Sequence, residues 1–418
     1  MYQERLKIDW LAVGLWAFLV LFGWITIYSS TYSGEDVSLF DLKTYHGKQL
    51  LWIGAAALVA FLTLFTEPRF FSNAAYPIYG AVVLMLVATL FLAVTVNGGK
   101  SWIEIGGFRF QPTEFAKFAT ALALAKYMSA IDVEWRQTRT KLTAAVIIAV
   151  PAALVFLQHD TGSALVFAAF VLPLFREGLS GVVLLVGVAA TALFVLALLV
   201  NKYILIGALV VVALLYLFVW LSKRTSRDYW NVAGVLLLCV AFVFSVDFMF
   251  NNVLESHQRE RIDVLLGKTE DLQGAGYNVH QSKIAIGSGG FFGKGFLHGT
   301  LTKADFVPEQ HTDFIFCTIG EECGWLGSTV VVALFVFLLV HLITMAERQR
   351  STFARFYGYS VASILFVHLF INVGMVLGLL PVIGIPLPFV SYGGSSLLAF
   401  TILLFIFIRQ DAVKNKLL

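Results

Sequence analysis

The chain has 418 residues, of which 59% are hydrophobic and only 13% are charged, and its mean hydropathy is +0.84. Soluble globular proteins carry about 25% charged residues, so this composition excludes that class and predicts an integral membrane protein. The formal net charge of +3 is small and gives no support for nucleic-acid binding. The three cysteines, Cys239, Cys317 and Cys323, lie in or beside apolar runs, so no disulfide framework is indicated.

A helix needs about 20 apolar residues to cross the hydrocarbon core of a membrane. Twelve runs approach that length, at about 8–30, 48–66, 74–96, 112–130, 141–157, 162–176, 180–200, 203–222, 229–250, 312–345, 352–380 and 389–409. They predict an all-α, polytopic membrane protein with a single domain over residues 1–418. The first run is expected to stay in the protein as a membrane helix, because no small-residue cleavage site follows it.

The basic residues predict how these helices are oriented. If the N-terminus is inside, 17 Lys and Arg residues fall at cytoplasmic ends. Only Lys43, Lys48, Lys100, Arg109 and Lys202 fall in the short outer loops. Cytoplasmic loops of membrane proteins carry the excess of Lys and Arg. We therefore expect both termini in the cytoplasm and the polar loop 251–311 outside.

That polar loop is the longest interruption of the apolar pattern. Residues 251–313 hold nine of the 34 glycines and six of the 29 Lys and Arg residues. A glycine-rich backbone can approach an anionic group closely, and basic side chains neutralise its charge. Beside a membrane, this combination predicts a site for a phosphorylated lipid.

The motifs of the segment are GAGYNVHQSKIAIGSGG (274–290), GKGFLHGT (293–300) and FVPEQHTDFIF (306–316). Other motifs are GKSWIEIGGFRFQPTEFAK (99–117), QHDTGSA (158–164) and GIPLPFVSYGGSS (384–396). Together they resemble the SEDS family, and more narrowly its RodA type, the peptidoglycan glycosyltransferases of bacterial cell elongation. That family has ten membrane helices, so the resemblance implies a SEDS-type bundle of about twelve, with two helices inserted within 180–250.

The resemblance implies an enzyme that polymerises lipid II into β-1,4 glycan strands at the outer face of the cytoplasmic membrane and releases undecaprenyl pyrophosphate. Asp271 matches the family's essential carboxylate and would be the general base, whose pKa must lie near the operating pH. The family usually has DPLGAGY, and this chain has DLQGAGY. From the residues alone, an Asp beside Gly is more often a solvated loop residue, and Glu270 could share its role.

Four basic residues of the polar segment are candidates to contact the diphosphate of the substrate: Arg259, Arg261, Lys283 and Lys294. Basic groups would stabilise the charge that develops on a leaving diphosphate. The alternative is that they lie on anionic lipid headgroups as a solvated amphipathic surface.

Three ionisable residues fall at or near membrane depth, where such residues are costly and are functional candidates. Glu114 and Lys117 stand three apart and could pair on one helix face, and Asp160 follows another apolar run. The alternative for all three is a structural ion pair between helices. His159 replaces the proline that the family has beside this Asp.

Further candidates for substrate binding come from the other motifs. Trp102, in the loop after the third run, could stack on a sugar ring or anchor at the membrane interface. Glu309, His311 and Asp313 lack the spacing of a zinc motif, and the resemblance implies that they orient substrate or stabilise the fold. Ser391 lies in a turn that is expected to break the entry to the last helix, so that backbone groups face a cavity.

The resemblance also implies a divalent cation, Mg²⁺ or Mn²⁺, that helps the diphosphate to leave. Its ligands stay open, and Glu321 and Glu322 are possible partners for it. The implied protein partners are a class B penicillin-binding transpeptidase and other membrane proteins of the elongation complex.

Two other functions stay open at this point. One is a transporter that flips lipid II and uses Glu114, Lys117 and Asp160 as a relay. The other is a scaffold for the elongation machinery. A division-type, FtsW-like paralogue is a third possibility, because those relatives share the PE-x-HTDFIF element.

Overall fold

The structure is a computed structural model that describes residues 7–32, 39–96, 99–105, 108–130, 137–220, 225–252, 259, 276–304 and 306–414. It forms two compact units. The first consists of Met1–Gly178 and Tyr277–Leu418, and the second consists of Leu179–Gly276. The single domain that we expected over residues 1–418 stays a prediction.

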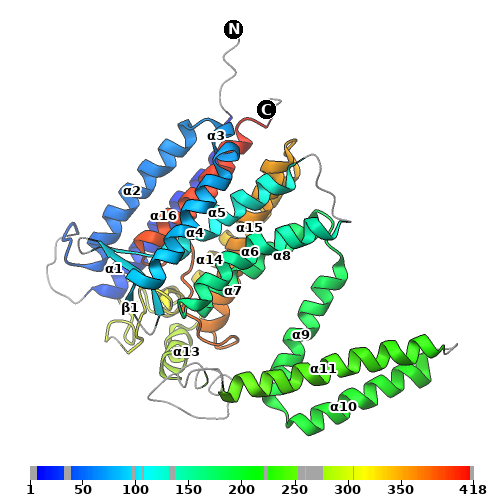
Figure 1. Cartoon of the computed structure of the whole chain (residues 1–418). Coiled ribbons are helices and arrows are strands. Elements are labelled where there is room, and N and C mark those ends of the chain that lie inside the picture. Colours follow the sequence, from blue (N-terminus) through cyan, green and yellow to red (C-terminus); the bar gives the residue numbers. More distant parts are fainter. Residues whose placement is uncertain are drawn as a thin grey trace. The chain divides into compact units, whose positions relative to one another are not determined.

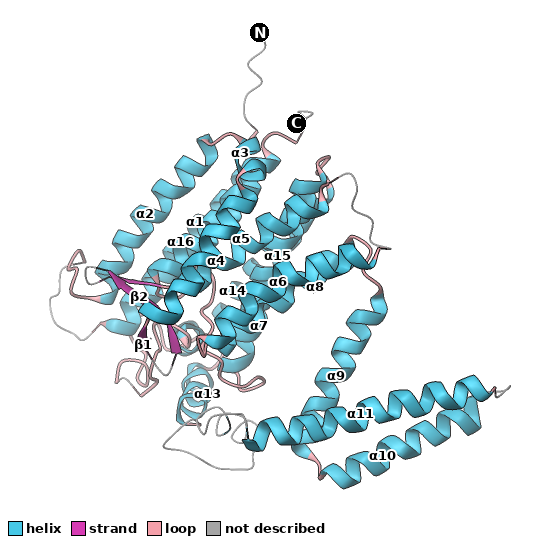
Figure 2. Cartoon of the chain, in the orientation of Figure 1, coloured by secondary structure: helices cyan, strands magenta, loops and turns pink. Residues whose placement is uncertain are grey.

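Helices make up nearly all of the first unit (Figures 1 and 2). They are α1 (Trp10–Thr31), α2 (Tyr45–Phe65), α3 (Pro68–Asn73), α4 (Ala75–Leu92), α5 (Pro112–Met128), α6 (Thr138–Leu157), α7 (Thr161–Val166), the 3₁₀ turn η1 (Phe167–Phe170), α8 (Val171–Arg176), α13 (Tyr277–Gly289), α14 (Ile315–Glu347), α15 (Thr352–Val376) and α16 (Gly394–Asp411). The all-helical membrane fold predicted from the apolar runs is confirmed.

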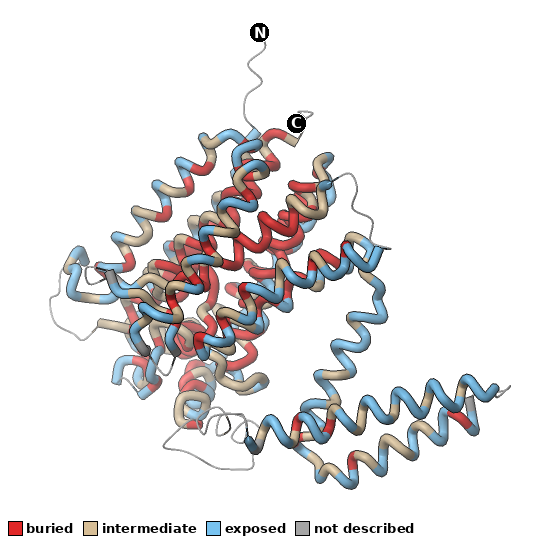
Figure 3. The backbone as a smooth tube through the Cα atoms, in the orientation of Figure 1, coloured by how far each residue is buried: buried red, intermediate tan, exposed pale blue. Residues whose placement is uncertain are grey.

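The core of this unit lies where α5, α15 and α16 pack against one another. Buried residues lie on nearly all sides of these helices, whereas α2 and α4 expose apolar side chains on one side (Figure 3). Large aromatic residues fill the contacts, including Phe356 and Tyr357 on α15 and Phe407 on α16. A helix that is apolar all round is typical of a buried position, and the exposed apolar faces of the outer helices suit contact with lipid.

The connection between α4 and α5 is a small antiparallel sheet rather than the loop that we expected. Its strands are β1 (Val94–Val96), β2 (Gly99–Ile105) and β3 (Phe108–Phe110), in the order β1-β2-β3. Trp102 on β2 pairs with Val94, and Ile103 pairs with Phe110. Trp102, Ile103 and Ile105 are residue types that favour strands, which is the strand signal that the sequence carries.

Helix α14 is interrupted at Gly324, whose φ of 67° is left-handed and favours glycine. Two carbonyls released by this break accept backbone N–H groups from the segment after α13, since Lys294 donates to Glu321 and Gly295 donates to Glu322, each over 3.0 Å. In return, the N–H groups of Trp325 and Leu326 donate to carbonyls at 290 and 291. The break therefore leaves these backbone groups paired, as membrane depth requires.

The start of α1 and the ends of α14 and α16 meet at one end of the first unit. Asp9 caps α1 through a 3.1 Å bond from the Ala12 N–H. Arg348 donates to Asp9 over 2.9 Å and to Asp411 over 2.8 Å. Burial raises the pKa of Asp9, but hydrogen bonds from His341, Ala12 and Arg348 outweigh it, so this pKa lies below its ordinary value.

The second unit contains α9 (Gly181–Leu199), α10 (Lys202–Leu215), the π-helical turn η2 (Tyr216–Trp220) and α11 (Ser226–Asn252). Most of their side chains are exposed and apolar. Lys202 and Asp247 form an ion pair of 2.9 Å between α10 and α11. The three helices predicted within 180–250 are present, and the assignment of two of them as an insertion stays a prediction.

Ten helices within the described ranges are long and apolar enough to cross a membrane. The two other predicted spans are helical but shorter: α5 has 17 residues, and the remaining one is the broken segment Thr161–Arg176. The protein is a multi-pass membrane protein, and its total of about twelve spans stays a prediction.

Candidate functional site

Three buried polar side chains meet between α5 and α15. Helix α5 begins at Pro112, a residue whose fixed φ suits the first helical turn, and this places Glu114 and Lys117 one turn apart. The Nζ atom of Lys117 donates to Oε1 of Glu114 over 2.6 Å, which confirms the predicted pairing. On its other side, Nζ lies 3.0 Å from Nε2 of His368 on α15. All three residues are at most 2% exposed, so this is a charged cluster inside the bundle.

The neighbours of His368 define its protonation in this cluster. Its Nδ1 atom lies 3.2 Å from the carbonyl oxygen of Pro386, which can only accept, so Nδ1 carries the proton. The lone pair of Nε2 is then free to accept from the Lys117 ammonium group. The ring of Phe400 lies 4.9 Å from the same ammonium group and adds a cation–π contact. Oε2 of Glu114 is buried and has no hydrogen-bond partner among the described residues.

Asp160 lies next to this cluster and caps α7. Its Oδ1 atom accepts from the Ser163 N–H over 3.0 Å, and its Oδ2 atom accepts from Gln111 Nε2 over 3.0 Å. Gln111 directly precedes α5, and its own N–H donates to Ser395 at the start of α16 over 3.2 Å. Asp160 is also close enough to Lys117 to interact with it electrostatically. The structure therefore brings Asp160 near the pair of Glu114 and Lys117.

A second group of predicted residues lies where the HTD motif meets the segment before α16. Asn372 is one turn after His368 on α15, and its Nδ2 atom donates to the carbonyls of Asp313 and Ile385 over 2.8 and 2.7 Å. Ser391 donates to the Thr312 carbonyl over 2.7 Å. One face of α15 thus connects the buried charged cluster to the HTD motif.

The ring of His311 lies in an aromatic group at this place. Its centroid is 4.1 Å from that of Tyr45 on α2 and 5.7 Å from that of Tyr392. The His311 carbonyl accepts from the Tyr392 N–H over 2.9 Å. Burial, followed by repulsion from Tyr45, raises the pKa of Tyr392, so its phenol stays neutral. Glu309 bonds locally, accepting from Thr312 Oγ1 over 2.9 Å.

No metal cluster is formed by the HTD motif. Among the residues that the structure describes, no three His, Cys, Asp or Glu side chains lie together in a way that could hold a metal ion. The divalent cation implied by the resemblance, and its ligands, stay a prediction.

The two candidate lysines of the polar segment, Lys283 and Lys294, have different surroundings. Helix α13 is fixed to α15 by Ser282, which donates to the Val376 carbonyl over 3.0 Å. The next residue, Lys283, is exposed. Lys294, in contrast, is bonded within the protein, with Nζ 2.7 Å from Glu321 and 2.6 Å from Thr300.

The family model for cell cycle proteins of the FtsW, RodA and SpoVE type matches residues 9–206 and 206–416. This chain belongs to that family. The match extends over both compact units and over every motif quoted above.

Curated relatives and solved structures agree with the family. The chain is 33% identical to the peptidoglycan glycosyltransferase MrdB of Escherichia coli K12 over 380 residues, which is 91% of this chain and 87% of the relative. It is 31% identical to the peptidoglycan glycosyltransferase RodA of Treponema pallidum over 401 residues, covering 91% and 92% of the two chains.

Among solved structures, a chain from a peptidoglycan synthase complex that coordinates polymerization and crosslinking matches with a TM-score of 0.73. The identity is 26%, and the match covers 98% of this chain and 99% of the other. The rod shape determining protein RodA of Thermus thermophilus matches with a TM-score of 0.63 at 24% identity, over 99% of both chains, which supports the fold.

Four further residues were predicted for the site: Asp271, Arg261, Arg259 and Trp102. Asp271 and Arg261 lie outside the described residues. Arg259 belongs to the second unit, where its guanidinium lies 5.7 Å from the Phe250 ring. Trp102 is half-buried on β2. Their roles in substrate binding and catalysis stay predictions.

Two residues that sequence analysis did not single out connect the site. His368 and Asn372 both lie in the apolar run of α15, and an ionisable or amide side chain at that depth was the available signal. Their partners, Lys117 and Asp313, are distant in sequence, so the contacts themselves could not be deduced from the chain.

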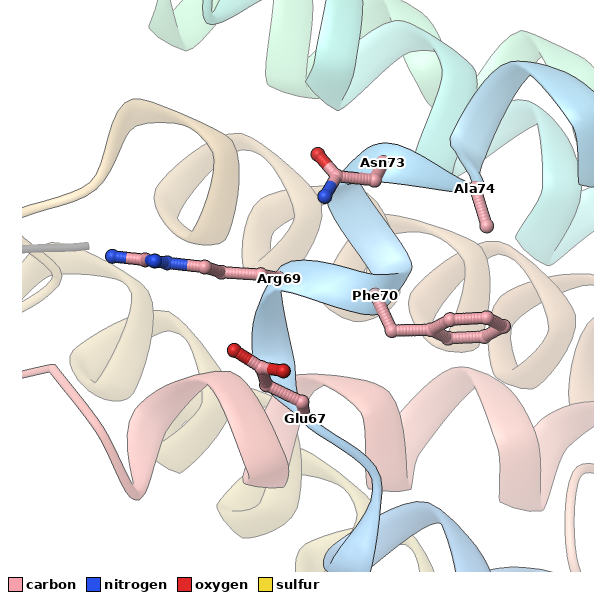
Figure 4. A pocket seen from close by; sticks show the side chains of 5 residues that line it. All are labelled: Glu67, Arg69, Phe70, Asn73 and Ala74. Carbon is pink, nitrogen blue, oxygen red and sulfur yellow. The ribbon is translucent and has the colours of Figure 1, made fainter.

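A shallow hollow of about 490 Å³ lies elsewhere in the first unit, at α3. Figure 4 shows its lining residues, Glu67, Arg69, Phe70, Asn73 and Ala74. None of the predicted site residues lines it, so it does not belong to the candidate site.

Proposed function

We propose that this protein is a peptidoglycan glycosyltransferase that polymerises lipid II into β-1,4 glycan strands during cell elongation. The observation that carries the proposal is the 33% identity to a peptidoglycan glycosyltransferase over 91% of the chain. The structure supports it by connecting the HTD motif to a buried cluster of charged residues through one face of α15. We place the reaction at the outer face of the cytoplasmic membrane.

The proposed chemistry needs one base and one stabilised leaving group. Asp271 would take the proton from the 4-hydroxyl of the GlcNAc unit of the acceptor lipid II. That oxygen then forms a bond to the anomeric MurNAc carbon of the growing strand, while the bond from this carbon to the diphosphate breaks. The carbon is inverted to a β-1,4 link, and undecaprenyl pyrophosphate leaves with the bonding electrons.

Several described residues have surroundings that suit a role toward the substrate. Lys283 is an exposed cation on α13 and can meet the diphosphate from the outer side. The unpartnered Oε2 atom of Glu114 can accept a hydrogen bond from a polar group that enters the bundle. An Mg²⁺ or Mn²⁺ ion bound to the diphosphate belongs to the proposal and would supply positive charge to the leaving group.

The proposed orientation places both termini in the cytoplasm. The excess of Lys and Arg at the inner ends supports it. The bonds of Arg348 to Asp9 and Asp411 also support it, because they hold the start of α1 and the end of α16 on the same side of the bundle.

The proposed partner is a class B penicillin-binding transpeptidase, within an elongation complex of other membrane proteins. The support is the structural match to a chain of a complex that coordinates polymerization with crosslinking. A polymerase whose strands are crosslinked by a second protein fits that arrangement.

The proposal is tested with purified protein and fluorescent lipid II, with and without the transpeptidase. Glycan strands resolved on a gel are expected, and lysozyme should digest them. Movement of lipid II across a vesicle membrane without strand formation would instead support a flippase and overturn the proposal.

A further inference from the structure

The side chain of Glu321 is fully buried on α14, and nearly all of its hydrogen bonds come from one short loop, residues 294–302. Its Oε1 atom accepts from Lys294 Nζ over 2.7 Å and from the Thr300 and Leu301 N–H groups over 2.8 and 3.0 Å. Its Oε2 atom accepts from the N–H and the hydroxyl of Thr302 over 3.0 and 2.7 Å. Three consecutive main-chain amides thus converge on one carboxylate.

This arrangement accounts for how a carboxylate can be buried here. An unpaired buried carboxylate is very costly, whereas one with a cationic partner and filled acceptor positions is tolerated. The loop has no helix or strand of its own, so its shape depends on these bonds. Gly299 fits the same contact, because a Cβ atom there would lie 3.1 Å from Glu321 Oε2 and would collide with Thr302.

The loop is held at a second place by the break in α14. Lys294 and Gly295 donate their N–H groups to the carbonyls of Glu321 and Glu322 over 3.0 Å. The carboxylate of Glu322 in turn accepts a hydrogen bond from Ser29 of α1. The same carboxylate accepts from the Leu297 and Gly299 N–H groups, so the loop is bonded to α14 and, through Glu322, is connected to α1. In the chain, the loop lies between α13 and the HTD motif.

We infer that Glu321 is a positioning residue for polymerisation, which holds loop 294–302 in one conformation, and that Lys294 acts through Glu321 instead of contacting the substrate diphosphate. The inference rests on the proposed function. The loop connects α13, which carries Lys283, to the HTD motif. A change in the conformation of the loop would therefore move Lys283 relative to the HTD motif. We expected Glu321 to be a possible partner for the divalent cation. Both of its carboxylate oxygens already accept hydrogen bonds from protein donors, so we infer that it positions the loop instead.

The test compares Glu321→Gln with Glu347→Gln, which removes a carboxylate that is ion-paired with Arg176 at the other end of the same helix. A hydrogen bond to a charged group contributes enough free energy to change an equilibrium by about tenfold or more. Removing the Glu321 charge should therefore lower the population of the ordered loop conformation by at least about that factor. For Glu321→Gln, we expect the rate of strand formation at saturating lipid II to fall by about tenfold or more, with little change in KM. Glu347→Gln should stay close to wild type.

Hydrogen exchange measured by mass spectrometry gives a readout that does not depend on activity. A peptide covering residues 299–304 should exchange about tenfold faster in Glu321→Gln, and peptides from α15 and α16 should not change. Unchanged exchange at 299–304, or faster exchange with normal polymerisation, would each overturn the inference. If Glu321→Gln does not fold, Thr300→Val with Thr302→Val removes only hydroxyl donors and should give the same changes to a smaller extent.

A double-mutant cycle tests the role of Lys294. Lys294→Met should slow strand formation, and adding it to Glu321→Gln should have no further effect, because both remove the same contact. Independent, multiplicative losses would show that Lys294 acts elsewhere and would overturn that part of the inference. A failure of the proposed function is distinguishable, because the wild-type protein would then form no strands either.

Discussion

Helices α15 and α9 are both long enough to cross a membrane, yet they differ in hydropathy and in how far they are buried. α9 is the more apolar of the two and is largely exposed, whereas α15 carries His368 and Asn372 and is buried on most sides. In a water-soluble protein the more apolar helix would be the buried one. Lipid tails are as apolar as Leu, so in a membrane the polar side chains gather inside, where they find partners.

The comparison indicates where substitutions matter. In α15, α16 and α5, a polar side chain is part of a network, and its loss leaves a partner without its bond. In α9, α10 and α11, most side chains meet no such partner. We therefore expect large effects on chemistry and stability from the first group and effects on membrane insertion from the second.

The largest effect is expected at Asp271, the residue that we propose as the general base. Asp271→Asn keeps the size of the side chain and removes the proton acceptor, so polymerisation should fall by about 10²–10⁴-fold. Binding of lipid II and association with the transpeptidase should survive. The measurement is strand formation by the purified variant.

Glu270→Gln is the matched control and should be much milder. A larger loss in Glu270→Gln than in Asp271→Asn would move the base to Glu270. Near-normal strands from Asp271→Asn would falsify the proposed mechanism.

The next effect is on the buried pair in α5. Lys117→Met leaves the Glu114 carboxylate without its cation and should destabilise the protein by about 3–5 kcal/mol. Thermal unfolding in detergent measures this loss. Combining Lys117→Met with Glu114→Leu should recover most of the stability, because an apolar pair replaces the ion pair, while strand formation stays low. Recovery of full polymerisation in the double variant would show that the pair is only structural.

These contacts also show how far the sequence could predict the structure. Apolar runs located every long helix, because length and hydropathy decide which segments enter a membrane. The pairing of Glu114 with Lys117 was predictable from their spacing on one helix. The contact of Lys117 with His368 joins residues 251 apart in the chain, and packing that distant is not encoded in any local pattern.

The role of Glu321 was beyond sequence analysis for a related reason. Its neighbouring residue Glu322 has the same chemical type, and nothing local separates one from the other. Only the break at Gly324 and the return of loop 294–302 decide which donors each carboxylate receives. Glu321 accepts from Lys294 and from the amides at 300–302, whereas Glu322 accepts from Ser29 and from the Leu297 and Gly299 N–H groups. Similarly, β2 was missed because the same residues fit a loop, and the strand depends on pairing with β1 and β3.

A smaller effect is expected where Asp9 joins α1 to α14 and α16. The pKa of Asp9 is lowered from 3.8, so the folded protein prefers the charged form. Its contribution to stability is present above the ordinary pKa of the unfolded state and is lost as the pH falls through the lower, folded value. Asp9→Asn should cost about 1 kcal/mol at pH 7 and make unfolding less sensitive to acid below pH 4. Identical acid sensitivity in both proteins, measured by thermal unfolding from pH 3 to 7, would contradict this role.

The smallest effect on chemistry is expected in α9. Val188 is 69% exposed in the middle of this helix, and Leu403 on α16 is 1% exposed, so the same polar substitution in each compares the two groups of helices directly. Val188→Asn places an amide where lipid is expected, so it should lower the amount of protein in the membrane. Its specific activity should stay within about twofold of wild type, as for surface substitutions that remove no contact.

Leu403→Asn buries an unpaired amide in the core and should lower both abundance and specific activity. Quantitative blotting of membranes, with strand formation normalised to protein, separates the two outcomes. Loss of specific activity in Val188→Asn at normal abundance would place α9 in the chemistry and remove the distinction between buried polar helices and lipid-facing apolar ones.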